Sequence, residues 1–514
     1  MPRTIEIDLR PEVYHSESLR LQAIARRLSL KAEEIDLVQV QRRSIDARRG
    51  IHYHVVASVY VGGEAQPSFS VRSPYRMCHQ APPVVIVGAG PAGLFAALHA
   101  LEVGLRPVII ERGRPVNERG RDIAQLGQSR HVDSESNWCF GEGGAGTYSD
   151  GKLYTRSTKR GDVGNVLRKF VEHGANPDIL IDTHAHIGTD KLSGIMAQMR
   201  TTIEGHGGEY HFRSRVVDLI VEGGRVQGVR CADGSTYHGV ATLLATGHSA
   251  RDIYHLFHSH GWLLEAKPFA LGVRVEHPQP LINSIQYHTS SPSPLLPPAA
   301  YSLKTQVGSH GVFSFCMCPG GVIVPAATAE GQQVVNGMSN SHRSSPLANS
   351  GIAVTVSASD VPTTDALSLM RWQQAVEEHM FRLAGGTISA PAQRLTDFCT
   401  GRTSRSLNAS GYIGPLVSAP LHEELPPFIT SSLQEGLRQF GRKMRGFYTS
   451  EANLLAVESR TSSPVRIPRQ ADGQHPQLPG LYPCGEGAGY AGGIVSSAID
   501  GIEAISLIAQ QQGL

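Results

Sequence analysis

Three glycines within residues 84–112 could bring a protein backbone close to a diphosphate. Gly88, Gly90 and Gly93 give the spacing G-x-G-x-x-G directly after the apolar, β-branched run 84–87. In this pattern the first glycine permits a tight turn, the second lets the backbone approach a pyrophosphate, and the third lets the next helix pack close to the strand. A helix that starts here aims its free N–H groups and its positive end at the ligand. The stretch therefore predicts a dinucleotide-binding β-α-β unit.

The second predicted strand, residues 108–110, ends in a carboxylate, as this kind of unit requires. Glu111 follows the strand about 20 residues beyond the glycines, where an acidic side chain can accept hydrogen bonds from a ribose. Pro91 suits the first position of the helix because its missing N–H costs little there. We predict that Pro91, Ala92, Glu111 and Arg112 lie beside the cofactor together with the three glycines.

Two later glycine-rich segments indicate which dinucleotide is bound. Residues 140–153, FGEGGAGTYSDGKL, could cradle a second anion or lie flat against a ring. Residues 480–495, GLYPCGEGAGYAGGIV, predict a strand, a glycine loop and a helix that starts near Gly493. Both segments exceed the needs of an NAD site but are needed to hold a flavin, so FAD is favoured. Because we find no second strand followed by G-x-G-x-x-G, a separate NAD(P) domain is not expected. NAD(P)H would bind transiently over the flavin, or oxygen would accept the electrons.

The periodicity of the chain divides it into four predicted parts. In residues 1–80, the order strand, helix, strand, strand indicates a small ferredoxin-like α+β domain. Residues 81–252 form the first part of the FAD-binding domain, with a long strand at 211–220 that leads into a β-meander. Residues 253–455 are rich in proline and serine and mix short strands with helices, as in a substrate or cap domain. Residues 456–514 complete the FAD-binding domain.

Composition limits the class of partner and the compartment. The net charge is only +2 over 514 residues, and no polybasic run indicates nucleic acid as a partner. The N-terminus lacks the apolar core of a signal peptide, and no apolar window of about 18 residues predicts a membrane span. The seven cysteines are widely spread without C-x-x-C, and His184 and His186 have no evident third ligand, so we expect neither disulfides nor a metal. A reducing cytoplasm fits this pattern. The oligomeric state is left open.

These motifs together resemble the glutathione-reductase-type FAD fold, and nearly the whole chain resembles a family of uncharacterised bacterial FAD-dependent dehydrogenases. The shared stretches are SIDAR (44–48), FGEGGAGTYSDGKL (140–153), HIGTDKL (186–192), ATGHSARD (245–252), KPFALGVRVEHPQ (267–279), FCMCPGG (315–321), NGMS (336–339), ESRTSSPVRIPR (458–469) and GEGAGYAGGIVSSAIDG (485–501). The resemblance implies an α/β protein with a Rossmann-like FAD-binding domain and an inserted mixed α/β substrate domain. The sequence departs from the family pattern at 288–310 and 400–420, both in the predicted substrate domain. The further FAD contacts that we predict are Gly143, Gly144, Ala145, Gly146, Thr147, Val216, Ala245, Thr246, Gly247, Gly485, Glu486, Gly492, Gly493 and Ile494.

A few polar side chains could act on a substrate or on the reduced flavin. His248 and Arg460 are the predicted catalytic residues, because cations beside a flavin can stabilise its anionic reduced form. A structural ion pair is the alternative for each. Cys316 and Cys318 form C-x-C, which could be a redox or nucleophilic thiol pair or merely two small residues packed on one face of a strand.

The sequence predicts an FAD-dependent oxidoreductase that transfers a hydride between a small organic substrate and flavin. One alternative is an oxygen-using flavin oxidase or monooxygenase that tailors an aromatic, indole-type natural-product intermediate. Another is a flavin-containing RNA-modifying protein, which the small N-terminal domain would suit but the near-neutral charge disfavours.

Overall fold

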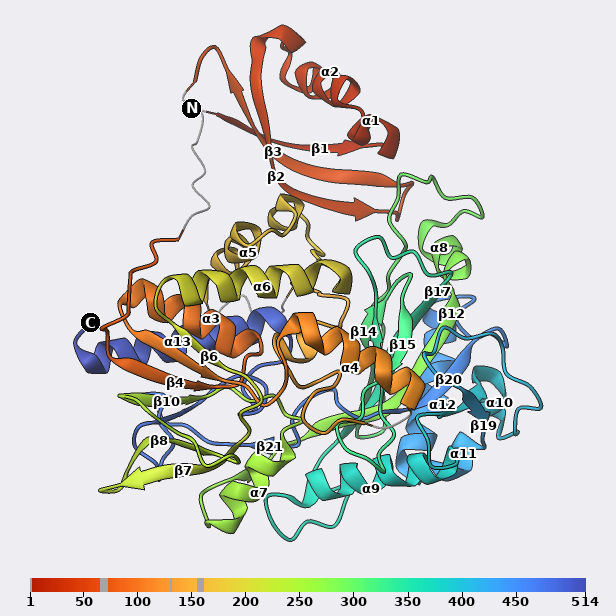
Figure 1. Ribbon diagram of the computed structural model, residues 1–514. Helices are drawn as coiled ribbons and strands as arrows, with labels where there is room; N and C mark the ends of the chain where they lie inside the picture. The colour runs from red at the N-terminus through yellow and green to blue at the C-terminus, as the bar shows by residue number, and fades with distance from the viewer. Residues whose placement is uncertain (1, 65–72, 130–131, 155–160) are drawn as a thin grey trace.

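The computed structural model describes residues 2–64, 73–129, 132–154 and 161–514. A small N-terminal unit lies beside two larger sheets (Figure 1). Its three strands form an antiparallel sheet in the order β1-β3-β2, packed against a helical hairpin around buried Ile5, Ile24 and Val55. Strand, helix, strand, strand is the predicted order, but residues 2–64 lack the further helix and strand of a complete ferredoxin-like unit. The elements are β1 (Arg3–Leu9), α1 (Pro11–His15), α2 (Glu17–Leu28), β2 (Ile35–Asp46) and β3 (His52–Val61).

The second sheet is fully parallel and has the order β22-β10-β4-β5-β6. Both of its faces are covered, so the central strand β4 is an unbroken apolar run. Val84 and Ile86 point into the core under the helices, while Val85 and Val87 face the core under a β-meander. The strands are β4 (Pro83–Val87), β5 (Arg106–Ile110), β6 (Glu209–His211), β10 (Ala241–Leu244) and β22 (Leu481–Pro483).

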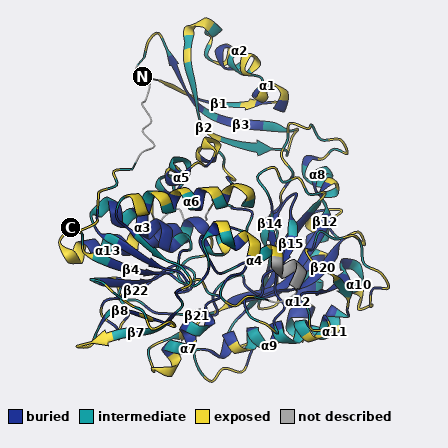
Figure 2. Cartoon of the chain, in the orientation of Figure 1, coloured by how far each residue is buried: buried dark blue, intermediate teal, exposed yellow. Residues whose placement is uncertain are grey.

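Helices cover one face of this parallel sheet, and the antiparallel meander β7-β8-β9 with α7 covers the other (Figure 1). Most residues of α3 and many of α13 are buried (Figure 2). The two helices pack against each other although some 400 residues separate them. The elements on the two faces are α3 (Pro91–Val103), α5 (Val163–Glu172), α6 (Thr189–Gly205), α13 (Ile494–Gln512), β7 (Val216–Glu222), β8 (Arg225–Cys231), β9 (Thr236–His238) and α7 (Arg251–Ser259).

One predicted strand of this region is wrong. Residues 211–220 do not form a single strand, because β6 ends at His211 in the parallel sheet and β7 begins at Val216 in the meander. Arg213 between them has a φ of +57°, in the left-handed region where extended backbone ends. The chain therefore passes from the parallel sheet to the meander within residues 211–220, which the sequence predicted to be one strand.

The third sheet has seven strands in the order β13-β14-β17-β12-β20-β18-β19, and a cluster of helices packs on it (Figure 1). β20 lies between β12 and β18 and continues to Glu458, so a domain boundary at residue 455 would cut this strand. The strands are β12 (Phe269–Pro278), β13 (Lys304–Val307), β14 (His310–Cys318), β17 (Leu347–Val356), β18 (Ala390–Arg394), β19 (Leu416–Ser418) and β20 (Asn453–Glu458). The helices are α8 (Gln279–Tyr287), α9 (Ser368–Leu383), α10 (Leu395–Thr400), α11 (Leu421–Glu424) and α12 (Pro427–Lys443).

The long segment after β5 contains a helix that the sequence did not predict, α4 (Val116–Ser129). Its buried face includes the charged residues Arg119 and Asp122, so the apolar periodicity of a helix is interrupted. Two short strand pairs complete the fold: β11 (Glu265–Ala266) with β21 (Val465–Arg466), and β15 (Val322–Pro325) with β16 (Val335–Met338). None of the helices in the described ranges combines the length and the apolar composition that a membrane span requires.

Candidate functional site

The turn between β4 and α3 places a helix N-terminus at the carboxyl edge of the parallel sheet. Gly88 has a φ of +107°, and a Cβ at Gly93 would lie 1.9 Å from the carbonyl oxygen of Gly88. Only glycine allows this approach, which brings the start of α3 against the strand. Gly90 is the N-cap residue and provides no side-chain cap, so the first N–H groups of the helix stay available to a ligand.

The carboxylate of Glu111 ties the surrounding loops together. Its Oε2 accepts a hydrogen bond from the N–H of Ala89 at 2.9 Å, and its Oε1 accepts from the N–H groups of Gly113 and Gly141 at 2.9 and 3.0 Å. Glu111 is 6% exposed. The residue predicted to hold a ribose therefore also holds the glycine loop 140–153 against the β4–α3 turn.

A second helix N-terminus lies next to the first. α13 begins after Gly493, whose φ is +101° and which provides no side-chain cap. A Cβ at Gly501 would lie 2.2 Å from the carbonyl oxygen of Ala92, so α13 crosses α3 at backbone contact. A Cβ at Gly146 would lie 3.3 Å from Pro91 and 3.4 Å from Ile494. The glycine loop thus sits between the two helix starts.

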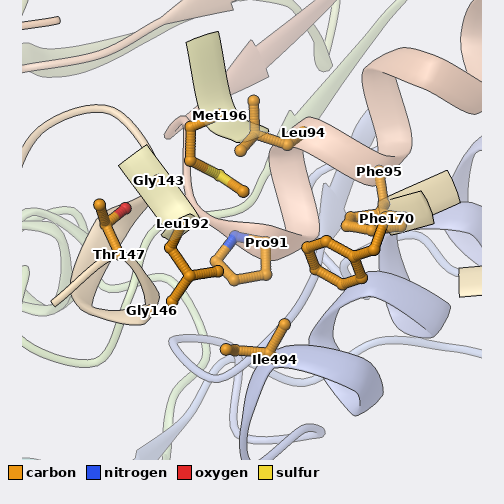
Figure 3. A pocket seen from close by; sticks show the side chains of 10 residues that line it. All are labelled: Pro91, Leu94, Phe95, Gly143, Gly146, Thr147, Phe170, Leu192, Met196 and Ile494. Atoms are coloured by element: carbon orange, nitrogen blue, oxygen red, sulfur yellow. The ribbon is translucent and has the colours of Figure 1, made fainter. Parts of the chain in front are cut away.

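A small apolar pocket opens at this meeting point (Figure 3). Backbone of the glycine loop forms one side, and side chains of α3, α5, α6 and α13 form the others. Its lining residues are Pro91, Leu94, Phe95, Gly143, Gly146, Thr147, Phe170, Leu192, Met196 and Ile494.

The segment after β10 brings a histidine to the loop that precedes α13. A Cβ at Gly487 would lie 2.0 Å from the carbonyl oxygen of Thr246, so the two segments touch through their backbones. The Nδ1 of His248 lies 3.2 Å from Oε2 of Glu486. Both ring nitrogens of His248 are buried, and in the described part of the chain neither has an aligned hydrogen-bond partner. Burial would raise the pKa of Glu486, but the contact with His248 and the N–H of Gly493 hold this pKa below its usual value.

Comparison with known proteins gives the family. Residues 268–461 match the family model "FAD-dependent protein, C-terminal domain-like", and residues 1–61 match a domain of unknown function. An uncharacterized protein of Clostridium beijerinckii is 38% identical over 502 residues, which is 93% of each chain. The chain belongs to this family of FAD-dependent proteins. FAD is its cofactor, and the flavoprotein is an FAD-dependent oxidoreductase.

Two further relatives are more distant from the flavoprotein. Digeranylgeranylglycerophospholipid reductase 1 of Methanococcoides burtonii is 26% identical over 158 residues, 30% of this chain and 34% of that protein. The crystal structure of a geranylgeranyl bacteriochlorophyll reductase-like protein from Thermoplasma acidophilum shares 13% identity, with a TM-score of 0.35 over 84% of this chain and 79% of that one.

The residues around the two helix starts fit FAD. A Cβ atom at Gly90, Gly492 or Gly493 would meet no protein atom within 4 Å among the described residues, so the backbone there is open to a ligand. The uncapped N-termini of α3 and α13 have N–H groups that would be available to the diphosphate and the flavin end of FAD. The Nε2 of His248, on the ring side away from the Glu486 contact, is buried at this edge without a hydrogen-bond partner among the described residues.

The structure brings most of the predicted FAD contacts of the flavoprotein together. Gly144 lies against Gly90, and Gly485 lies against Ala92. Ala245 continues the parallel sheet by donating its N–H to the carbonyl of Val87 at 2.9 Å. These contacts group the β4–α3 turn, the residues 143–147, the residues 245–247 and the residues 485–494 around one edge. Val216, at the start of β7, is buried in the core between the parallel sheet and the meander.

Arg112 is held by acidic side chains of the protein. It pairs with Glu135 at 3.2 Å and with Asp252 at 3.1 Å, and its guanidinium lies 4.4 Å from the centre of the Phe140 ring. These contacts fix the position of Arg112 at the end of β5.

Arg460 does not have the setting expected of a catalytic cation. Its N–H groups donate to Glu377, Ser249, Thr328 and Gln332 through five hydrogen bonds, which use all five donors of a guanidinium. The side chain is 5% exposed. Arg460 therefore fits the alternative interpretation of the sequence, a structural ion pair, because the carboxylate of Glu377 is buried beside it.

Two structural residues of this site are not among the predicted site residues, although Asp500 lies within the shared stretch 485–501. Arg119 is fully buried and donates to the carbonyls of Asn137, Trp138 and Glu142. These hydrogen bonds fix the backbone at the start of the glycine loop. Asp500 accepts the N–H of Gly485 at 2.7 Å. Each acts through backbone that is distant in sequence, and a single charged residue in a helix gives no signal of such a role.

Proposed function

We propose that the flavoprotein transfers a hydride between a small organic substrate and its flavin. The observation that supports this most is the meeting of two uncapped helix N-termini with a glycine loop whose far end contacts the connection between β16 and β17. Asp150, at the end of this loop, pairs with Arg343 at 2.7 Å and also accepts from the hydroxyl of Ser339. The flavin end of the site would therefore face the residues 253–458, which we assign to the substrate.

The arrangement suits a glutathione-reductase-type FAD-binding domain, formed by the residues 81–252 and 459–514. When bound, FAD supplies a two-electron acceptor, and the protein supplies binding, orientation and electrostatics. The uncapped helix start at Gly90 would bind the diphosphate, and the one at Gly493 would lie toward the ring. His248 is placed to hold or move a proton at a ring nitrogen, with its Nδ1 beside Oε2 of Glu486.

The experiment is an anaerobic reduction of the purified holoenzyme followed at the flavin band, about 450 nm. Rapid bleaching by NADPH or NADH alone, and reoxidation by an organic acceptor rather than by air, would support a dehydrogenase or reductase. Reduction by an organic substrate, with rapid hydrogen peroxide formation in air, would retain the hydride transfer and make oxygen the acceptor, which is the oxidase alternative. A flavin that neither NADH, NADPH nor any organic substrate reduces, and whose reduced form no organic acceptor reoxidises, would overturn the proposal.

A His248→Gln variant separates the role of the histidine from that of the cofactor site. We expect FAD content to be retained, while the pH dependence of flavin reduction by substrate changes. The matched control is His255→Gln, on the following helix α7. An unchanged pH profile in His248→Gln would remove His248 from the proposal.

A further inference from the structure

The C-x-C pair lies where β14 meets the end of the glycine loop. The Nζ of Lys152 lies 4.0 Å from the Sγ atoms of both Cys316 and Cys318, and it donates a hydrogen bond to the carbonyl of Met317 between them. Cys318 is fully buried, but Cys316 is only half-buried. Among the seven free cysteines, Cys139 and Cys316 alone are not fully buried. Cys316 is thus a half-buried residue whose sulfur lies beside an ammonium group.

The backbone holds Cys316 in an unusual conformation. Its φ is +46°, in the left-handed region that favours glycine, and the pairing of β14 with β17 shifts register between Phe315 and Cys318. The Nη1 of Arg274 donates to the carbonyl oxygen of Cys316 at 3.2 Å. A cysteine persists in such a conformation only where its surroundings impose it. Here the conformation coincides with the register shift between β14 and β17.

The charges around the sulfur leave an excess of positive charge. Arg274 is fully buried and pairs with Glu458 at 2.6 Å, while Lys152 lies 3.8 Å from Asp150. Asp150 also pairs with Arg343 at 2.7 Å. Three cations therefore share two carboxyl groups, and a thiolate at Cys316 would neutralise the cluster. The charged and titratable groups around Cys316 are Asp150, Lys152, His186, Arg274, Tyr301, Cys318, Arg343 and Glu458.

The titration of the two thiols agrees with this geometry. The hydrogen bond from Cys318, followed by the charges of Lys152 and Arg274, holds the pKa of Cys316 well below its usual range although burial opposes this. The pKa of Cys318 is raised, first by the neighbouring Cys316 and then by burial. The sulfur that carries the negative charge is therefore that of Cys316, the half-buried member of the pair.

We propose that Cys316 is a nucleophilic thiolate that adds to the electrophilic carbon of a small α,β-unsaturated carbonyl compound, with Lys152 as the adjacent acid. The activity is separate from flavin reduction. A lone pair on Cys316 Sγ forms the S–C bond, the C=C π pair moves to the α carbon, and the Lys152 ammonium supplies the proton that this carbon takes up. Lys152 regains a proton from water, so no oxidant or reductant is consumed.

The test uses N-ethylmaleimide, a probe of this chemical class, with the reduced holoenzyme. Labelling of each cysteine is followed by peptide mass spectrometry between pH 5 and pH 9. We expect Cys316 to be labelled at least about tenfold faster than Cys139 at pH 6, with a midpoint below the ordinary thiol value of about 8.5. Labelling of Cys316 no faster than that of Cys139 overturns the proposal.

Variants then separate a thiolate from a merely exposed thiol. Lys152→Gln should move the midpoint for Cys316 upward and slow labelling at pH 6, while Lys152→Arg should retain most of the rate. Cys318→Ser should leave Cys316 as the labelled residue. If Lys152→Gln retains FAD and the circular dichroism of the parent but labels with an unchanged pH profile, Lys152 does not activate the sulfur. If that variant does not fold, the labelling midpoints of Cys316 and Cys139 in the parent decide, and a midpoint of Cys316 at or above that of Cys139 overturns the proposal.

Discussion

At the scale of single residues, Glu111 shows how one carboxylate can organise a cofactor site. Because it accepts three backbone N–H groups, Glu111→Gln would place an amide N–H₂ against a backbone donor. Leaving a buried donor unsatisfied costs about 1–3 kcal/mol. We expect the free energy of unfolding in urea to fall by this amount even without FAD, and FAD affinity to fall as well.

The control for this prediction is Glu118→Gln, at a half-exposed ion pair with Arg213. Surface pairs contribute only about 0–1 kcal/mol, so this variant should resemble the parent. If Glu111→Gln loses FAD affinity with no loss of stability in the FAD-free protein, its hydrogen bonds to the loops do not contribute as we infer.

The buried carboxylate of Glu377 leads us to predict that the stability of the protein depends on pH. Burial alone would raise its pKa, but Arg251 and Arg460 lower it to about 2. The folded pKa lies below the ordinary 4.5, so the stabilisation is complete above about pH 4.5 and is lost as the pH falls toward 2. A pKa shift of this size corresponds to about 3 kcal/mol in the free energy of unfolding.

Glu377→Gln should therefore be less stable than the parent by about 3 kcal/mol at pH 6, with a difference that shrinks toward pH 3. Urea unfolding at a series of pH values measures this difference. Glu378→Gln, at the neighbouring half-exposed position, is the matched control. A constant difference across the pH range would show that the ion pairs of Glu377 are not responsible.

At the scale of secondary-structure elements, the two glycines of the β4–α3 turn have separable tasks. A Cβ at Gly93 would meet the carbonyl of Gly88 at 1.9 Å, whereas a Cβ at Gly90 would meet no described protein atom within 4 Å. We expect Gly93→Ala to destabilise the FAD-free protein by about 1–3 kcal/mol, as overpacking does. Gly90→Ala should leave that stability unchanged and weaken FAD binding at least about tenfold, a loss of about 1.4 kcal/mol.

Thermal unfolding without and with added FAD, together with FAD titration by fluorescence, measures both effects. Equal FAD affinity in Gly90→Ala and the parent would mean that the diphosphate does not approach this turn.

The same scale shows what the sequence could and could not predict. The β4–α3 turn and the start of α13 were predictable because each joins an apolar strand to glycines that only close backbone approach explains. The helix α4 was not, because its buried face carries Arg119 and Asp122. The setting of Arg460 was not predictable either, because its partners come from segments distant in sequence. Local patterns thus reveal how a backbone must run, while buried ion pairs depend on tertiary contacts.

At the scale of the whole molecule, the N-terminal unit is attached to the rest of the chain through the stretch 44–48 and its surroundings. Ile45 packs both in the core of this unit and against the core of the seven-stranded sheet. The hydroxyl of Tyr53 donates to the carbonyl of Leu295 at 3.4 Å, within the unusual segment 288–310. No local pattern in the sequence could pair these stretches. Part of what distinguishes 288–310 is therefore a contact with the N-terminal unit.

Arg43 is the main polar link between the N-terminal unit and the segment before α6. Its guanidinium donates to Asp182 at 2.9 Å, to Asp178 at 3.0 Å and to the hydroxyl of Tyr14 at 2.8 Å, and its N–H donates to the carbonyl of Ile181 at 2.8 Å. Hydrogen bonds to charged groups contribute about 1.5–3 kcal/mol each.

Arg43→Ala should therefore raise the population in which the N-terminal unit is undocked by about tenfold or more, since 1.4 kcal/mol is a factor of ten. Limited proteolysis that releases the N-terminal unit reports this population when opening and closing are faster than cleavage. The matched control is Arg42→Ala, at the adjacent exposed position of β2. If both variants release the N-terminal unit at the rate of the parent, the side chain of Arg43 does not hold it, and the docking must depend on the apolar contacts of Ile45 instead.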